Sequence, residues 1–365
     1  MDPRRFKKEG LKHLDRVIEL CAQEGIYTII DLHAAAGGQN VDWHSDTGIH
    51  KALFWEHRDF QERTILLWEW LAEHYRGNPW VAGYNPLNEP TDSHGGKRLV
   101  AFYQEVEKRI RAVDGKHVLF LEYGFPNPPE EYKGTVEQKD KLKKSYERKI
   151  QYMREINGPI WNGEFGPVYA SSDAPDAERI NASRYQALSD QLTMYDDPRA
   201  KASWSIWLWK DIGFQGMVFV DKETAYMKLM EPFLKKKRVS DSYGSLVEDT
   251  TEPTDRSWCG QQELVVDAWG VDETPVRDLF QPLIDWTNHA VPSLKNKYPS
   301  TWNEKRYLRR VVREILIAEA LCDEYAEYFR DKSMDELDAL AMSFHYDKCV
   351  QRTELNDILT AHRGD

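Results

Sequence analysis

The chain has 365 residues, a formal net charge of −12 and a hydrophobic content of 41%. This length and apolar content allow one large barrel or two ordinary domains with a sizeable core. The acidic balance argues against a nucleic-acid-binding protein, because phosphate backbones require a basic surface, and the sequence contains no apolar run long enough to span a membrane.

Helical and strand patterns alternate along the first 240 residues. Apolar residues at helical spacing, of which Leu11, Leu14 and Ile18 are typical, predict helices over residues 4–24, 60–76, 96–114, 136–156 and 225–238. Short apolar runs predict strands at "IYTIIDLH" (26–33), "WVAGYNPLN" (80–88), "KHVLFLE" (116–122), "GPIWNGEF" (158–165) and "ASWSIWLW" (202–209). Strands that alternate with helices are typical of βα units around a parallel sheet, so the predicted fold class is α/β.

A change of composition marks the predicted domain boundary. Residues 241–257 are polar and contain Pro, Ser and Thr, which is typical of a linker or a long surface loop. Residues 258–365 are expected to be mostly helical, with the clearest helical pattern at "EKRYLRRVVREILIAEALCDEYAEYFR" (304–330). We therefore expect a catalytic domain over 1–240, a linker over 241–257 and a helical C-terminal extension of unknown role.

Two glutamates stand at the ends of apolar strands: Glu89 in "NPLNEP" and Glu164 in "WNGEFG". In parallel α/β folds the carboxyl ends of the strands meet at one face of the sheet. A carboxylate among apolar neighbours is costly unless it is paired or functional. Two acids that face each other suit glycoside hydrolysis, whereas two buried salt bridges are the structural alternative. Spacing and position alone leave these alternatives about equal.

The local sequences favour the enzyme. "NPLNEP" and "WNGEFG" together resemble the family 5 glycoside hydrolases of clan A, which are relatives of cellulases and exo-β-1,3-glucanases, and the resemblance extends over residues 6–237. It implies a (β/α)8 TIM barrel in which Glu89 is the acid/base and Glu164 the nucleophile. Asn88 matches the residue that binds the sugar 2-hydroxyl, His33 matches the histidine of the third barrel strand, and Trp207 matches the tryptophan that floors the −1 subsite.

The family retains anomeric configuration, so the resemblance implies a two-step displacement with carboxyl groups about 5–5.5 Å apart. The expected substrate is a β-glucoside or a β-glucan, with β-mannan or a glucosylated lipid as alternatives. The alternative from another class is a catalytically impaired fragment that at most binds carbohydrate. No cofactor is expected, and the oligomeric state stays open.

Other residues have weaker claims to the substrate cleft. Trp43, His44 and Asp46 lie on the loop that leaves the catalytic face after "IYTIIDLH", and Asp211 and Gln215 follow the last predicted strand. Trp209 shares a strand face with Trp207 and is expected to support it. No metal site is expected, because the histidines of the first loop have no matched carboxylate spacing. On the residues alone, a core histidine is the favoured interpretation of His33, and both tryptophans could be packing residues.

The resemblance has gaps. A full barrel needs eight strands, and we predict five. The two strands that the family places before "IYTIIDLH" have no counterpart, and neither does the strand that bears a His-x-Tyr motif, because Glu122 runs straight into Tyr123. We therefore expect an incomplete barrel. The first residues, "MDPRRFKKEG", lack the apolar core of a signal peptide, which makes a cytoplasmic location the default, but an N-terminus that looks truncated leaves secretion open.

Overall fold

The computed structural model describes residues 4–46, 51–92, 96–122, 132–170, 175–199, 201–241, 269–270, 274, 293 and 317–363. The described residues divide into two compact units. Residues 4–122 belong to the first unit, and residues 132–241 and 317–363 belong to the second.

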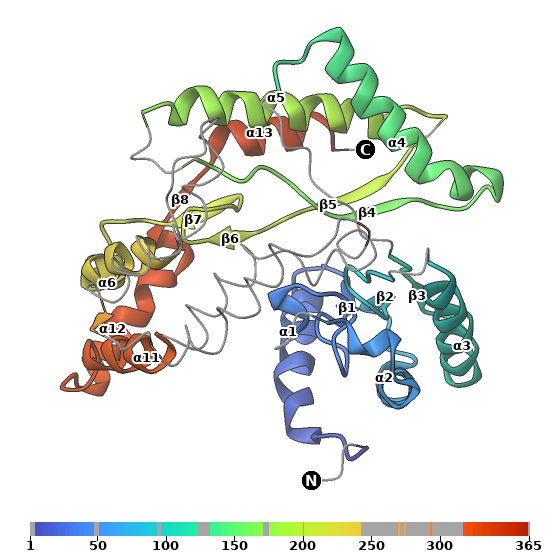
Figure 1. The fold of residues 1–365 in the computed structure, drawn as a ribbon, viewed down its shortest axis with the longest axis horizontal. Helices are drawn as coiled ribbons and strands as arrows, with labels where there is room; N and C mark the ends of the chain where they lie inside the picture. The colour runs from blue at the N-terminus through green and yellow to red at the C-terminus, as the bar shows by residue number, and fades with distance from the viewer. Residues whose placement is uncertain are drawn as a thin grey trace. The chain divides into compact units, whose positions relative to one another are not determined.

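The first unit is a three-stranded parallel sheet with helices packed against it (Figure 1). In chain order its elements are η1 (Lys8–Gly10), α1 (Leu11–Gln23), β1 (Thr28–Asp31), η2 (Trp43–Ser45), η3 (Leu53–Trp55), α2 (Arg58–Tyr75), β2 (Val81–Asn85), α3 (Lys97–Val113) and β3 (Val118–Leu119). The strand order is β1-β2-β3, and Asp31 and Asn85, the last residues of β1 and β2, are partners in the register. The ends of these strands therefore lie side by side.

Packing explains why these segments fold as they do. Ile18 of α1, Trp68 of α2 and Val106 of α3 are buried in one apolar cluster with Tyr84 of β2. The indole N–H of Trp68 also donates to the carbonyl oxygen of Pro86 at 3.0 Å, which ties α2 to the segment after β2. This cluster holds the sheet and its helices as one body, as their burial removes large apolar surfaces from water.

The close approach of β2 and β3 requires a glycine. A Cβ atom at Gly83 would lie 2.1 Å from the carbonyl oxygen of Val118, which belongs to the neighbouring strand. No side chain fits at that distance, so a larger residue would push β3 away. Because β3 leads directly into Glu122, this contact also sets the position of the residues after β3.

The second unit carries the remaining described strands. Its elements are α4 (Val136–Glu155), β4 (Trp161–Phe165), α5 (Ala177–Tyr195), β5 (Ser203–Ile206), β6 (Lys210–Asp211), β7 (Val218–Val220), α6 (Ala225–Asp241), α11 (Ala318–Glu327), α12 (Met334–Ala341), η6 (Met342–Phe344), η7 (Tyr346–Lys348), β8 (Cys349–Gln351) and α13 (Thr353–Ala361). Strands β4 and β5 are parallel, and a second small sheet has the order β6-β7-β8, with β8 antiparallel to β7.

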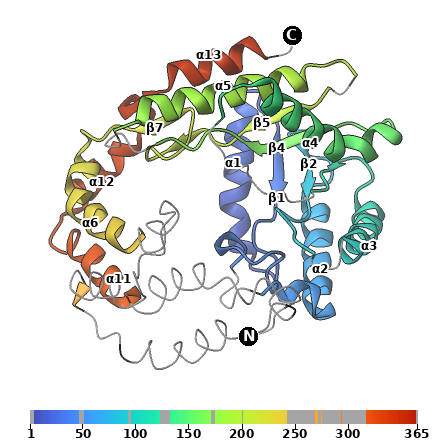
Figure 2. The same ribbon diagram turned by 45° about the horizontal axis from the view of Figure 1, so that its top comes forward.

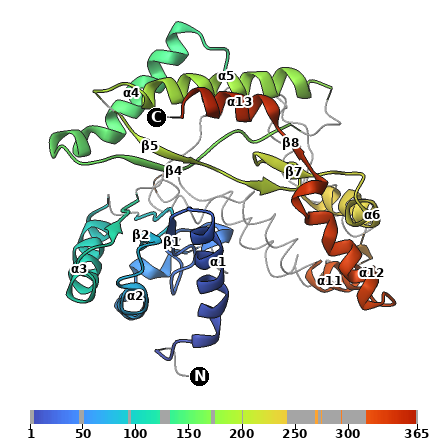
Figure 3. The same cartoon turned by 180° about the vertical axis from the view of Figure 1, so that it is seen from behind.

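The C-terminal residues pack onto this unit. Helix α13 lies beside α5 (Figure 2), where Leu355 and Leu359 share a buried cluster with Leu188 and Leu192. Helix α12 lies beside α6 (Figure 3). The described part of the C-terminal region therefore contributes both helices and one strand to the unit that holds β4 and β5.

The five predicted strands are confirmed as β1 to β5, and the five helices predicted before residue 240 as α1, α2, α3, α4 and α6. Of the helical segment predicted over 304–330, residues 317–330 are described and contain α11, and residues 304–316 lie outside the described residues. The helix α5 and the short strands β6, β7 and β8 were not predicted. The predicted linker lies outside the described residues except for Asp241 at the end of α6, so the domain division stays a prediction. Within the described part of the chain, no helix is both long and apolar enough to cross a bilayer.

Candidate active site

The candidate site of the first unit lies at the carboxyl ends of its three strands. Asp31 ends β1, Asn85 ends β2 and leads to Glu89, and Glu122 follows β3 by three residues. Parallel pairing places these ends at one edge of the sheet. The site is therefore built from backbone turns that leave three neighbouring strands.

A buried glutamine joins the turn after β1 to the turn after β2. The Gln39 side-chain amide donates to the carbonyl oxygens of His33 at 2.7 Å and Asn88 at 2.9 Å, and its oxygen accepts from the N–H of Ala35 at 3.1 Å. Its backbone carbonyl accepts from the indole N–H of Trp55 at 2.8 Å. These bonds satisfy the polar groups of the buried Gln39, and they hold the segments of His33 and Glu89 together.

Glu89 is held by contacts to its backbone and to its side chain. The Asn40 amide donates to the Glu89 carbonyl at 3.0 Å, and the Glu89 N–H donates to Oε2 of Glu122 at 2.8 Å. The Glu89 carboxylate lies 3.1 Å from Nε2 of His44 and is about half exposed, at 47%. The residue has a φ of +44°, a left-handed conformation that is unusual for a residue other than glycine.

Two titratable groups around Glu89 have shifted pKa values. Burial raises the pKa of Glu122 to about 6; the Asp31 and Glu89 carboxylates add to this rise, and hydrogen bonds from the Glu89 N–H and the Asn85 amide oppose it. Burial also lowers the pKa of His44, an effect that the Glu89 carboxylate opposes and the His33 imidazole reinforces. The site thus gathers a carboxyl group whose pKa is raised and an imidazole whose pKa is lowered.

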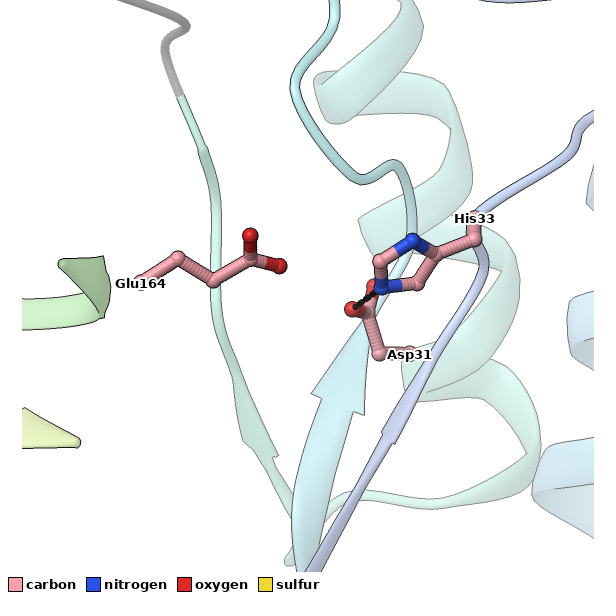
Figure 4. A group of neighbouring side chains, drawn as sticks. All are labelled: Asp31, His33 and Glu164. Atoms are coloured by element: carbon pink, nitrogen blue, oxygen red, sulfur yellow. Dashed lines mark ion pairs between the residues drawn. The ribbon is translucent and has the colours of Figure 1, made fainter. Parts of the chain in front are cut away.

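The structure places the other predicted residues of the first unit near these turns. His33 forms an ion pair with Asp31, with 2.8 Å between Nε2 and Oδ2 (Figure 4). Asn88 is buried, and its Oδ1 has no hydrogen-bond partner among the described residues. Trp43 and His44 lie on η2, and Asp46 follows that element with a φ of +57°. The His44 side chain contacts the Glu89 carboxylate.

The remaining predicted residues lie on the second unit. Glu164 is the fourth residue of β4 and is drawn with its side chain in Figure 4. Trp207 follows β5, and its N–H donates to the Phe165 carbonyl at 2.8 Å, so it is tied to the strand of Glu164. Asp211 ends β6, and its Oδ2 accepts from the N–H of Gln215 at 2.6 Å. Trp207, directly after β5, thus lies beside the end of β4, the strand of Glu164, and Asp211 and Gln215 share one turn.

Three residues that contact Glu89 or the segment before it were not predicted: Gln39, Asn40 and Glu122. A signal existed for Glu122, because it is an acid at the end of an apolar strand, the same feature that singled out Glu89 and Glu164. No comparable signal existed for Gln39 and Asn40, which are polar residues in a glycine-containing loop, and such residues are common in solvent-exposed turns.

Comparison with known proteins identifies the family. The family model for cellulase, glycosyl hydrolase family 5, matches residues 2–125. A β-xylosidase of Phanerodontia chrysosporium is 45% identical over 394 residues, which cover 99% of this chain and 77% of the relative. Cellodextrinase A of Ruminococcus flavefaciens is 34% identical over 118 residues, which cover 31% of this chain and 32% of the relative. The chain thus spans about three quarters of the first relative and about a third of the second.

A solved structure of Cel5A from Thermotoga maritima in complex with cellobiose is 18% identical, with a TM-score of 0.46 over 60% of this chain and 75% of that chain. The alignment with the β-xylosidase is longer than this chain, so the relative contains residues within it that have no counterpart here. This difference and the open sheets of the described residues agree with the expected gaps in the barrel. The chain belongs to glycosyl hydrolase family 5 and is a glycoside hydrolase with an incomplete (β/α)8 barrel.

Proposed function

We propose that the chain is a retaining β-glycoside hydrolase in which Glu89 is the acid/base and Glu164 the nucleophile. The observation that carries this proposal is the way Glu89 is held. Its N–H and its carbonyl are both hydrogen-bonded, and its half-exposed carboxylate faces His44. A carboxylate that only stabilised the fold would be expected to have a buried cationic partner, whereas a proton donor must be fixed in position and open to substrate.

The proposed reaction has two steps. In the first, a carboxylate oxygen of Glu164 forms an ester bond to the anomeric carbon, the glycosidic bond breaks, and Glu89 gives its proton to the leaving oxygen. In the second, Glu89 takes a proton from water while the water oxygen attacks the anomeric carbon and the ester bond breaks. Both displacements invert the anomeric carbon, so the configuration is retained.

Three further residues have proposed roles in binding the sugar. The buried Asn88 is proposed to bind the 2-hydroxyl group, and its Oδ1, which has no partner among the described residues, is a suitable acceptor. The half-exposed His33 is proposed to contact the same sugar. Trp207 is proposed to form the apolar floor of the −1 subsite, since a tryptophan face suits the C–H face of a sugar ring.

A β-glucoside or β-glucan is the proposed substrate, on the resemblance to cellulases and exo-β-1,3-glucanases. The name of the relative that is 45% identical favours a β-xyloside as the second candidate. The two sugars differ in the hydroxymethyl group at C5, which a xylosidase has no need to accommodate. Aryl β-glucosides and aryl β-xylosides with the same leaving group would separate them by kcat/KM; aryl β-mannosides and a glucosylated lipid belong in the same panel.

Azide rescue tests the roles of the two glutamates. Glu164→Ala should abolish turnover, and azide should restore it with an α-glycosyl azide as product, because azide then attacks the substrate directly. Glu89→Ala should still form the glycosyl-enzyme from a substrate with a good leaving group, and azide should release the β-azide. The opposite stereochemistry would reverse the assignment. If the parent chain and both variants give no product with any of these sugars, the chain is a catalytically impaired fragment.

A further inference from the structure

We propose that Glu122 is a positioning residue for Glu89, and that its carboxylate fixes the backbone conformation from which the Glu89 side chain points at the substrate. This inference rests on the proposed acid/base role of Glu89. It concerns a residue that neither the resemblance nor the comparisons single out.

The Glu122 carboxylate bridges the two ends of the turn that follows β2. Its Oε2 accepts from the N–H of Glu89 at 2.8 Å, and its Oε1 accepts from the side-chain amide of Asn85, the last residue of β2. One rigid carboxylate therefore holds both the start of the turn and the acid/base residue. Hydrogen bonds to an ionised acceptor are stronger than neutral ones, so this bridge is a firm support.

Glu122 is itself anchored. The hydroxyl group of Tyr103 on α3 donates to the Glu122 carbonyl at 2.9 Å and accepts from the Glu122 N–H at 3.1 Å. Tyr103 is buried in the apolar cluster of the unit. The position of the carboxylate is thus set by a core helix, and it does not depend on the loops that leave the strands.

The backbone of Glu89 needs such a support. A left-handed conformation at a residue with a Cβ atom costs roughly 1–3 kcal/mol, and it persists only where the surroundings enforce it. At Glu89, with its φ of +44°, the enforcing contacts are the bond from its N–H to Glu122 and the bond from Asn40 to its carbonyl. Without Glu122 the turn can relax toward a common conformation, and the side chain would then leave in a different direction.

Two substitutions separate geometry from charge. In Glu122→Gln, the side-chain oxygen of the new glutamine can still accept from the Glu89 N–H. Its NH₂ group can donate to Asn85 if the Asn85 side-chain amide rotates so that Oδ1 faces residue 122. The Asn85 Oδ1 is buried and without a hydrogen-bond partner among the described residues, so it is free to accept. Glu122→Ala removes both bonds. The matched control is Asp114→Ala, which removes a buried acid at the other end of β3 that bonds Tyr84 and His117.

The first measurement is the dependence of kcat/KM on the leaving group, because kcat/KM reports the first step alone, in which Glu89 is the acid, whereas kcat also contains the second step, in which Glu89 is the base. An acid catalyst matters for a poor leaving group and hardly at all for 2,4-dinitrophenolate. Glu122→Ala should therefore lower kcat/KM for a phenyl glycoside by on the order of 10²-fold, a loss that a misplacement of about 1 Å can cause, and leave kcat/KM for the dinitrophenyl glycoside within a few fold. Glu122→Gln and Asp114→Ala should depend on the leaving group in the same way as the parent chain does. Equal losses on both leaving groups in Glu122→Ala, or equal losses in the Gln and Ala variants, would overturn the proposal.

The second measurement does not need turnover, so it separates this inference from the proposed function. In protein labelled with ¹⁵N-glutamate, the Glu89 amide signal is assigned by its absence in Glu89→Gln. In the parent chain, the Glu89 amide signal should be shifted downfield, and the amide should be protected from hydrogen exchange. Both properties should be lost in Glu122→Ala. The protection should remain in Asp114→Ala. If the chain shows this pattern but has no turnover, the result would contradict the proposed function and support the positioning role of Glu122. An unchanged Glu89 signal in Glu122→Ala would overturn the positioning role of Glu122.

Discussion

Nε2 of His44 lies 3.1 Å from Oε2 of Glu89, and the same nitrogen lies 3.0 Å from the side-chain amide of Asn40. Asn40 also donates to the Glu89 carbonyl, so it holds the backbone of Glu89. Nε2 of His44 can bond one of these neighbours at a time: with a proton it donates to the Glu89 carboxylate, and without a proton it accepts from the Asn40 amide. An ionised Glu89 carboxylate selects the form of His44 that carries a proton on Nε2. His44, which was predicted only to line the cleft, therefore orients the carboxylate of Glu89.

We expect His44→Phe to lower kcat while thermal stability changes little. The phenyl ring keeps the shape of the imidazole but cannot bond the carboxylate, and a misdirected catalytic group commonly costs on the order of 10²-fold in rate. The control is His74→Phe, because His74 forms a similar pair with Asp15 on helices α1 and α2, with 3.0 Å between Nε2 and Oδ1. Equal kinetic losses in the two variants, measured with phenyl glycosides, would show that His44 does not orient Glu89.

Glu122 should make the stability of the parent chain depend on pH. Burial raises its pKa from 4.5 to about 6 in the folded state, and the neighbouring Asp31 and Glu89 carboxylates add to the rise. Between these values the folded chain holds a proton that the unfolded chain releases. The stabilisation is thus complete below pH 4.5 and is lost as the pH rises through 6.

Glu122→Gln removes this titration. Relative to the variant, the parent should lose about 2 kcal/mol in its free energy of unfolding between pH 4.5 and 7, at about 1.4 kcal/mol for each unit of pKa shift. Urea unfolding of both proteins across this range measures the difference, and the effect of His44 cancels because both proteins contain it. If the difference in the free energy of unfolding between the two proteins stays constant with pH, Glu122 has the same pKa in the folded and unfolded states.

The two tryptophans after β5 should differ in function. Trp207 is 38% exposed; Trp209 is 56% exposed and stacks on Tyr346 with ring centroids 5.6 Å apart and 13° between the planes. Trp207→Ala should weaken the binding of a glucose-type inhibitor by roughly 1–3 kcal/mol, the general effect of losing a large buried contact. Calorimetric titration measures this, with urea unfolding to monitor stability. If Trp209→Ala weakens binding more than Trp207→Ala does, Trp209 is the sugar platform.

The described elements show which features a sequence can predict. Long apolar runs and helical spacing were sufficient for β1 to β5 and for most of the helices. Strands β6 and β8, at Lys210–Asp211 and Cys349–Gln351, are too short to show a period of two. In α5 the buried residues Leu188, Leu192 and Tyr195 occupy only the second half of the helix, which weakens the pattern.

The candidate site was likewise only partly predictable from the sequence. Glu89 and Glu164 could be predicted because strand ends and local motifs mark them. The contact between Glu122 and the Glu89 N–H depends on the register of β2 and β3, in which Gly83 pairs with Val118 and Tyr84 with Leu119. A single sequence does not specify the register of two parallel strands that are separated by a helix, so this contact could only come from the structure.

The C-terminal residues should stabilise the turn of Asp211 and Gln215. The guanidinium of Arg352 donates to the Gly213 carbonyl at 2.7 Å and lies over the ring of Tyr169, 3.5 Å from its centroid. Arg352→Leu should lower the free energy of unfolding by about 2 kcal/mol, as expected for a partly buried hydrogen bond from a charged group. The control is Arg199→Leu, which removes an exposed pair with Asp197 and should cost little. Similar losses in urea unfolding would show that Arg352 is no more than a surface charge.

The gaps in the barrel should limit both stability and activity. In the sheet of the first unit, β1 and β3 are the outer strands. Apolar residues next to both are exposed: Tyr27 by 65% just before β1, and Val118 by 53% in β3 itself. Uncovered strand edges with exposed apolar side chains favour aggregation. We therefore expect the chain as given to be poorly stable and nearly inactive.

Adding the family's missing strands should reverse this. The test protein carries the two strands that the family places before β1, and the His-x-Tyr strand between Glu122 and Tyr123, each taken from a family 5 enzyme with a complete barrel. The added strands would pair the open edges and cover Tyr27 and Val118, and the tyrosine would add a catalytic contact of a kind commonly worth about 10²–10³ in rate. Activity on aryl β-glucosides and β-xylosides, thermal unfolding and light scattering compare the two proteins. Equal kcat/KM for both would mean that the described residues already form a complete site and that no strand is missing from it.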